Sequence, residues 1–137
     1  MSGNKGSAAG EAVRRKILGD AHVDRSNEGN KPYNRDFLDL VTRYGWGEIW
    51  ARPGLSHHQR RILVIGTMIA LGKWDEFRMH VRPALASGQF SLADLSEVIL
   101  QQTIYCGFPA GNTAFREVRQ VLKELEAEGV HIEGMDD

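Results

Sequence analysis

One continuous stretch, RRILVIGTMIALGKWDEFRMH from Arg60 to His80, constrains the fold of this chain more than any other. Its first half, Ile62 to Leu71, contains no charged residue, so a helix formed there has no hydrophilic face. We therefore expect this helix to be buried on all sides. At Gly72 the chain turns and continues as a second, charged helix.

The charged helix carries a histidine beside an apolar stripe. Trp74, Phe77 and Val81 recur at intervals of three and four residues, which places them on one face. His80 follows Phe77 by three residues and lies next to this face. It is either a hydrogen-bonded packing residue, the commoner role of a buried histidine, or a functional imidazole held against a core or pocket.

Composition narrows the class of protein. The chain has 137 residues, 42% of them hydrophobic, which suits one domain with its own core. Its net charge is −1, with acids and bases mixed, so nucleic acid and anionic membranes are not expected partners. The longest apolar run is about half of the ~20 residues that span a bilayer, and no signal peptide is evident, so a cytoplasmic protein is predicted. The single cysteine, Cys106, excludes an internal disulfide and a zinc site of several thiolates.

Helical periodicity dominates the rest of the chain, and no segment alternates with a period of two for long enough to predict a strand. We predict an all-α, single-domain bundle of about six helices over residues 12–130. A disordered, glycine-rich tail at 1–11 and a flexible C-terminus at 131–137 are expected on either side. Outside the central stretch, the predicted elements are a short helix at 12–18, an ordered arm or long loop at 20–34, and helices from Asn34, from Ser91 to Cys106, and from about Asn112 to Glu128.

Local signals mark several helix ends. Ser91 followed by Asp94 resembles a capping box, and Gly129 is a suitable stop for the last helix. The glycines and proline of residues 45–54 are expected to break the helix that begins at Asn34. One apolar face of that helix is predicted to consist of Phe37, Leu38, Val41 and Tyr44.

The segment YGWGEIWARPGL combines two tryptophans with two charges. Trp46 and Trp50 flank Glu48, and Arg52 follows Glu48 by four residues. The tryptophans are either core anchors or the walls of a site, and Glu48 with Arg52 is either a surface ion pair or part of that site. The residues alone leave both interpretations open.

The segment IYCGFPAGN is predicted to expose backbone at the start of the last helix. Its glycines leave N–H groups near Gly107 that suit a carboxylate or an oxyanion, beside Tyr105 and Cys106. A nucleophilic thiol needs a basic partner, and no histidine lies near Cys106 in sequence. A structural thiol is therefore favoured over a catalytic one.

Four blocks of sequence occur in an order and spacing that point to one family. They are GDAHVDRS, TRYGWGEIWARPGL, ALGKWDEFRMHVRPAL and IYCGFPAGNTAF, between about Arg14 and Arg116. They closely resemble the carboxymuconolactone decarboxylase family. The resemblance implies decarboxylation of 4-carboxymuconolactone to the β-ketoadipate enol-lactone in protocatechuate breakdown, without a cofactor. It also implies an all-helical fold shared with alkyl hydroperoxidase D, usually assembled as a hexamer.

The chain departs from its relatives in instructive ways. Pro83 should bend the helix that carries His80, and Gly111 stands where relatives often have alanine. The wider superfamily contains thiol peroxidases with a Cys-x-x-Cys-x-x-x-His motif, but counting back from His80 the thiol positions hold Glu76 and Lys73. Disulfide chemistry is therefore excluded, and a histidine kept without the thiols favours a functional role for His80.

The implied reaction needs cations for two carboxylates, a proton donor to carbon, donors for an enolate oxygen and apolar walls. Arginine suits carboxylates because its planar fork binds them with two hydrogen bonds. No metal is required. The candidate residues are His80 or Glu48 as the acid, Arg52, Arg43 and Arg60 as cations, Trp46, Trp50 and Tyr105 as walls, and Cys106 and Gly107 near the oxyanion donors.

The expected partners are a small lactone and further copies of the chain. A helix apolar on all faces in so short a chain predicts a homo-oligomer, a trimer or hexamer, because neighbouring subunits cover such a helix more easily. The alternative function is a non-catalytic or differently specific helical oligomeric binding protein of the same superfamily. Turnover of the lactone separates the two.

Overall fold

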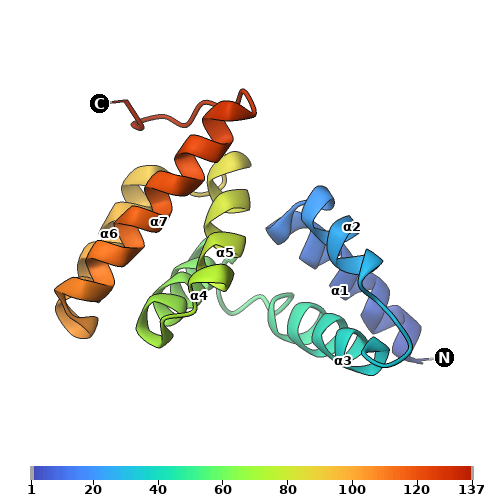
Figure 1. Cartoon of the computed structure of the whole chain (residues 1–137). Helices are drawn as coiled ribbons and strands as arrows, with labels where there is room; N and C mark the ends of the chain where they lie inside the picture. Colours follow the sequence, from blue (N-terminus) through green and yellow to red (C-terminus); the bar gives the residue numbers. More distant parts are fainter. Residues whose placement is uncertain (1, 137) are drawn as a thin grey trace. The chain divides into compact units, whose positions relative to one another are not determined.

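Helices make up the regular structure of this protein, as the periodicity predicted. The structure, a computed structural model, describes the backbone of residues 2–136 and the side chains of residues 8–136 (Figure 1). Within residues 2–136 it contains α-helices and one π-helix but no strand. The predicted all-α class is confirmed.

The chain divides into two compact units, one ending at His57 and the other beginning at His58. The single domain that the sequence predicted over residues 12–130 stays a prediction. The segment 51–56, which leads from one unit to the other, is not helical and contains Pro53 and Gly54. Both residues disfavour a helix, proline because it lacks an N–H and glycine because ordering its backbone is costly.

The first unit consists of α1 (Ser2–Leu18), α2 (Asp20–Glu28), α3 (Arg35–Leu40) and the π-helix η1 (Val41–Ile49). At residues 8–11 the chain is helical, where composition predicted a disordered tail. Gly10 explains the difference, because a Cβ there would lie 2.1 Å from the carbonyl oxygen of Thr42 and 3.0 Å from the amide nitrogen of Gly47. The glycine lets α1 pack directly on the backbone of η1.

Residues 20–28 form helix α2, where the sequence predicted an arm or long loop. Only residues 29–34 of that predicted segment are not helical. Val23 is the buried residue of α2, so the helix has no apolar stripe that periodicity can detect. It is held to α1 by polar contacts instead. Arg15 binds Asp20 at 3.1 Å and Asp24 at 2.8 Å.

The glycines after Tyr44 do not break the helix as predicted. The chain continues as η1, and the amide of Trp50 donates to the carbonyl of Gly45, five residues earlier, at 2.9 Å. Glycine adapts to this wider turn more easily than other residues. Two residues of the predicted apolar face, Phe37 and Tyr44, are exposed.

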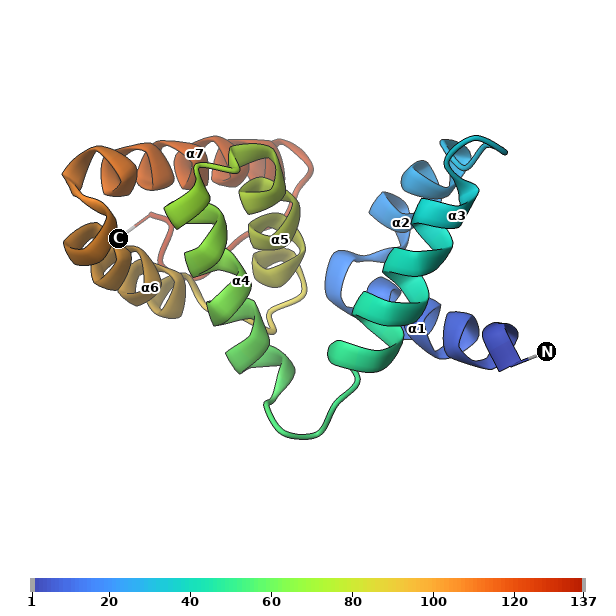
Figure 2. The same ribbon diagram turned by 90° about the horizontal axis from the view of Figure 1, so that it is seen from below.

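The second unit consists of α4 (His57–Leu71, from His58 on), α5 (Trp74–Ala86), α6 (Leu92–Cys106) and α7 (Phe108–Ala127). Helices α6 and α7 lie side by side (Figure 2). Residues from all four helices, with Phe90 and Ile132, form one core. As predicted, Phe77 and Val81 of α5 are buried in it, and Trp74 packs edge-on against Phe77 with ring centroids 5.4 Å apart.

Helix α4 is not buried on all sides in one copy of the chain. Ile65 and Ile69 enter the core, but Leu63 and Leu71 are 58% and 63% exposed. The core of the second unit lies against one face of α4, so the prediction of burial on all sides is wrong for the single chain.

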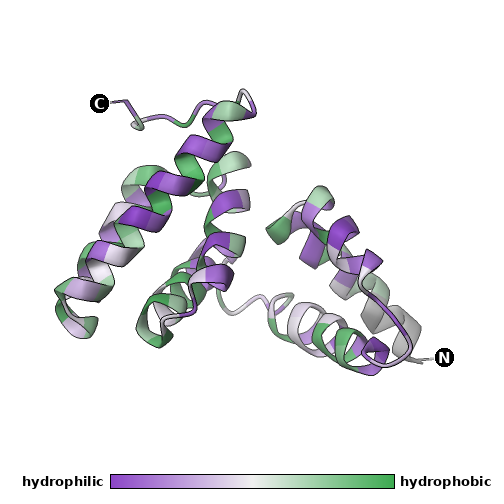
Figure 3. Ribbon diagram, viewed as in Figure 1, coloured by the Kyte–Doolittle hydropathy of each residue, from purple (hydrophilic) through white to green (hydrophobic). Residues whose placement is uncertain are grey.

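Several predicted helix ends are confirmed. The Oγ of Ser91 accepts the amide of Asp94 at 3.0 Å, and Gly107 and Gly129 follow α6 and α7 with positive φ of 99° and 80°. Helix α7 begins at Phe108, earlier than the predicted Asn112, because proline at the second position suits the first turn of a helix. Figure 3 shows hydrophobic and hydrophilic residues alternating along α7.

Candidate active site

The predicted site residues lie in both units. Glu48, Trp46 and Arg43 are on η1, and Trp50 and Arg52 follow it directly. The remaining candidates belong to the second unit: Arg60 on α4, His80 on α5, Tyr105 and Cys106 on α6, and Gly107 between α6 and α7.

Two tryptophans and a histidine form an aromatic cluster in the first unit. The ring centroids of Trp46 and Trp50 are 5.0 Å apart with planes tilted by 32°, and His57 lies 6.1 Å from Trp50. Both tryptophans are buried, whereas Glu48 and Arg52 are exposed. The π-helical turn thus places the aromatic rings and the charges of this segment in different environments, one able to supply an apolar wall and the other polar contacts.

His80 is buried in the middle of α5 and is only 7% exposed. Phe77, one turn earlier, and Ala84, one turn later, belong to the core. The imidazole therefore borders the core directly, as the spacing predicted. A proton donor in such surroundings acts with little competition from water.

A second charged side chain of this unit is buried, and sequence reasoning did not select it. Arg61 on α4 is only 1% exposed, while its neighbour Arg60, the predicted cation, is half-buried. The signal was present in the sequence, because Arg61 precedes Ile65 and Ile69 by four and eight residues and thus shares their face. Arg60 does not lie on that face.

Two arginines of the second unit have pKa values shifted in opposite directions. Burial lowers the pKa of Arg61, since its charged form is partly removed from water. The carboxylate of Glu117 instead raises the pKa of Arg78, which joins α5 to α7 through that ion pair. Arg82 strengthens the same helix contact by binding Glu124 at 3.3 Å and also Glu128.

At the junction of α6 and α7, one of the backbone N–H groups predicted to bind an oxyanion is already hydrogen-bonded within the protein. The amide of Gly107 donates to the carbonyl of Thr103 at 2.9 Å, so this N–H is already used. Pro109 has no N–H, which leaves Phe108 and Ala110 as the donors of the first turn of α7. Tyr105 is 78% exposed and Cys106 is half-buried.

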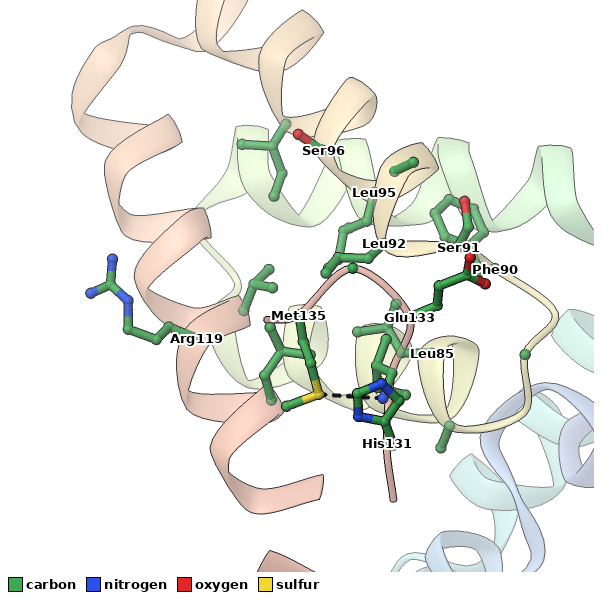
Figure 4. Close-up of a pocket in the computed structure, with 18 of the residues that line it drawn as sticks. Leu85, Phe90, Ser91, Leu92, Leu95, Ser96, Arg119, His131, Glu133 and Met135 are labelled. Carbon is green, nitrogen blue, oxygen red and sulfur yellow. Dashed lines mark hydrogen bonds between the residues drawn. The ribbon is translucent and has the colours of Figure 1, made fainter. Parts of the chain in front are cut away.

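One cavity of the second unit is lined by none of the predicted site residues. It has a volume of about 1210 Å³ and lies among the end of α5, helices α6 and α7, and the C-terminal segment (Figure 4). Leu92 and Leu95 line it, and the amide of Ile132 donates to the sulfur of Met135 at 3.3 Å across its edge. Ile132 is buried, so part of the C-terminal segment, predicted to be flexible, packs against the core.

Among residues 2–136, no helix is long and apolar enough to cross a membrane. In the same range, no three His, Cys, Asp or Glu side chains are grouped so that they could hold a metal ion.

The sequence of this chain matches a known family of enzymes. Residues 35–120 match the carboxymuconolactone decarboxylase family, and the chain belongs to this family of decarboxylases. The matched region includes η1 and the helices that carry Arg61 and His80.

Individual relatives fall within the same class of reaction. The chain is 41% identical over 116 residues to a 4-carboxymuconolactone decarboxylase of Acinetobacter baylyi, covering 85% of this chain and 86% of the relative. It is 31% identical over 120 residues to a nitrosuccinic acid decarboxylase of Metarhizium robertsii, covering 88% and 83%. A 4-carboxymuconolactone decarboxylase of Pseudomonas putida is 48% identical over 40 residues, which is 29% of this chain.

Proposed function

We propose that this enzyme decarboxylates 4-carboxymuconolactone to the β-ketoadipate enol-lactone and uses no cofactor. The observation that carries the proposal is the 41% identity to the Acinetobacter baylyi enzyme, which extends over most of both chains. The buried His80 and the aromatic cluster of Trp46 and Trp50 fit the chemical needs of this reaction.

The reaction moves one electron pair and one proton. The bond between the ring carbon and its carboxylate breaks, CO2 leaves, and the pair moves through the ring double bond onto the lactone carbonyl oxygen. A proton then binds the carbon next to that carbonyl. We assign this proton to His80, with Glu48 as the second candidate, because a buried imidazole can donate near neutral pH.

Apolar and polar groups have separate roles in this scheme. Trp46, Trp50 and Tyr105 supply apolar walls beside the leaving carboxylate, whose loss of charge is favoured where water is excluded. The N–H groups of Phe108 and Ala110, beside Cys106 and Gly107, take the place of the predicted donors to the enolate oxygen. The cations predicted for the carboxylates are Arg52, Arg43 and Arg60.

A different substrate is the second candidate, and the relative from Metarhizium robertsii favours it. Nitrosuccinic acid, like the lactone, carries a carboxylate on a carbon whose electron pair can pass to an oxygen acceptor, here a nitro group. A single site that stabilises the negative charge left after loss of CO2 could therefore act on nitrosuccinic acid and on the lactone. The two substrates therefore differ in shape and hydrogen bonding more than in mechanism.

The test compares both substrates with purified protein. We expect the absorbance of carboxymuconolactone to fall with stoichiometric release of CO2, at a kcat/KM at least tenfold above that for nitrosuccinate. A preference for nitrosuccinate would establish the second candidate. Turnover of neither compound, by protein that is folded by circular dichroism, would contradict the proposal.

The proposed enzyme is a homo-oligomer, a trimer or hexamer. Its support is a set of large apolar side chains at the end of α6 and the start of α7 that are exposed in one chain. Tyr105, a proposed wall residue, belongs to this set, so the wall needs a second copy to exclude water. The set consists of Leu100, Ile104, Tyr105 and Phe108.

A further inference from the structure

The helix formed by α3 and η1 presents large apolar side chains to solvent (Figure 3). Its other side packs on α1, since a Cβ at Gly10 would lie 2.1 Å from the carbonyl oxygen of Thr42 and 3.0 Å from the amide nitrogen of Gly47. The exposed side chains follow helical spacing, and the last of them comes five residues after the one before it, as suits a π-helical turn. They are between 37% and 66% exposed and form what we call the α3–η1 face: Phe37, Leu40, Val41, Tyr44 and Ile49.

The α3–η1 face has no part in the proposed reaction. The apolar walls proposed in the same unit are Trp46 and Trp50, which are buried. The exposed apolar set of α6 and α7 belongs to the other unit and is a separate surface. Five large apolar side chains that lie together in water are typical of a surface that binds another protein.

Two charged residues border the α3–η1 face on the same side. Asp36 directly precedes Phe37, and Arg43 directly precedes Tyr44, so each lies beside an aromatic residue in the same way. Both charges are exposed, and neither forms an ion pair with any residue that the structure describes. They are seven residues apart, about 10 Å along the helix, which is too far for them to pair with each other.

This distribution of charge is complementary to itself. We propose that the α3–η1 face binds the same face of a second copy, with the two helices antiparallel about a two-fold axis between Leu40 and Val41. Such an axis places Phe37 opposite Tyr44 of the partner subunit, and does so twice, because both residues are equally far from it. It also brings Asp36 towards Arg43 of the partner subunit. Parallel helices would instead place like charges side by side, which opposes association.

The size of the face is sufficient for such a contact. Two copies of the five side chains cover on the order of 1000 Å² between them, which is the lower end for a specific interface. Arg43, one of the three predicted cations, then serves this contact and leaves Arg52 and Arg60 for the substrate. Combined with a three-fold contact elsewhere, a two-fold contact gives a hexamer and not a trimer.

The first test is the size of the assembly. In sedimentation velocity at micromolar concentration, Tyr44→Asp should halve the mass of the parent species, because it places a charge in each half of the two-fold contact. The matched control is Ala21→Asp, an exposed change on α2, which should leave the mass unchanged. A parent protein with an odd number of copies, such as a trimer, would overturn the proposal, as would a Tyr44→Asp protein with the parent mass.

Charge reversal tests the ion pair while the apolar side chains stay in place. Asp36→Arg should raise the dissociation constant of the two-fold contact about 10-fold, because it brings two arginines together. Adding Arg43→Asp should restore most of the affinity, since the facing charges are opposite again. A double variant that associates no better than Asp36→Arg alone would contradict the antiparallel arrangement.

Disulfide cross-linking measures the orientation directly. The background is Cys106→Ser, which has no other cysteine. Oxidation of a mixture of Phe37→Cys and Tyr44→Cys proteins should give dimers with one copy of each, because these positions face each other across the contact. Each variant alone should cross-link much more slowly. Equal cross-linking of Phe37→Cys with itself would indicate parallel helices, and no cross-linking in any sample would mean that something other than a second copy covers the face.

The two proposed association surfaces can be told apart. This inference rests on the proposed oligomer only for the total number of copies, and it does not depend on the reaction. If Tyr44→Asp halves the mass and Ile104→Lys does not change it, the two-fold contact stands and the proposed role of α6 and α7 fails. The reverse result would overturn the two-fold contact and leave the proposed role of α6 and α7 in place.

Discussion

Gly111 on α7 faces Thr103 on α6 so closely that a Cβ at residue 111 would lie 2.2 Å from the Oγ1 of Thr103. The threonine hydroxyl is fixed by donating to the carbonyl of Ile99 at 2.7 Å. The approach of α6 and α7 at this point therefore requires glycine.

We expect Gly111→Ala to lower the free energy of unfolding by about 1–3 kcal/mol, because the added methyl group overpacks the helix contact. Thr103→Ala in the same protein should restore most of the loss, since it removes the atoms that the methyl group meets. Thermal unfolding of the two single variants and the double variant measures this coupling. A Gly111→Ala protein more stable than the parent would mean that helix propensity outweighs the contact.

Spacing along single helices was the part of the structure that the sequence could predict. Phe77, Val81 and the buried His80 follow from periodicity in α5, and the cap at Ser91 follows from local chemistry. Helix α2 could not be predicted in this way, because its stability depends on Arg15 in another helix. The burial of Arg61 was also predictable, because Arg61 shares the helical period of Ile65 and Ile69, whereas its neighbour Arg60 does not.

Cys106 is not required by the proposed chemistry. Cys106→Ser should keep kcat within a few-fold of the parent value, because no step forms a bond to sulfur. Cys106→Ala tests whether the activity of the serine variant depends on its hydroxyl group. Loss of several orders of magnitude of activity by a folded Cys106→Ser protein would show that the thiol takes part in the reaction.

The exposed apolar set on α6 and α7 predicts association. At micromolar concentration we expect sedimentation velocity to give a trimer or hexamer. Ile104→Lys should shift the protein towards smaller species, since it places a charge where an apolar contact is expected. Gln120→Lys, an exposed change on α7, is the control and should leave the assembly intact. A monomeric parent protein would refute the prediction.

His22 predicts a pH dependence of stability. Its pKa lies below the ordinary value of 6.5, first because of burial and then because of the positive charges of Arg25 and Arg14. The unfolded chain therefore binds a proton at higher pH than the folded one. The stability that neutral His22 contributes is present above pH 6.5 and is lost as the pH falls towards the lower, folded-state pKa.

Thermal unfolding between about pH 7.5 and 5 measures this loss. His22→Gln should make stability less dependent on pH in this window, whereas His131→Gln, which changes an exposed histidine, should not. An equal pH dependence in the parent and His22→Gln proteins would assign the effect to other groups.

The most informative change is His80→Gln. Glutamine keeps a hydrogen-bonding side chain of similar reach but cannot donate a proton as an acid near neutral pH. If His80 protonates the carbon next to the lactone carbonyl, kcat should fall by about 10²- to 10⁴-fold while the protein remains folded. Glu48→Gln, at the exposed second candidate, should then have a much smaller effect on kcat.

A structural histidine gives a different result for the same variant. Disturbing a buried polar group should lower the free energy of unfolding by about 1–3 kcal/mol and leave kcat of the folded fraction near normal. Measuring kcat and thermal stability of His80→Gln together therefore distinguishes the two roles. Near-normal turnover would transfer the role of proton donor to Glu48, and Glu48→Gln should then show the loss of kcat expected here for His80.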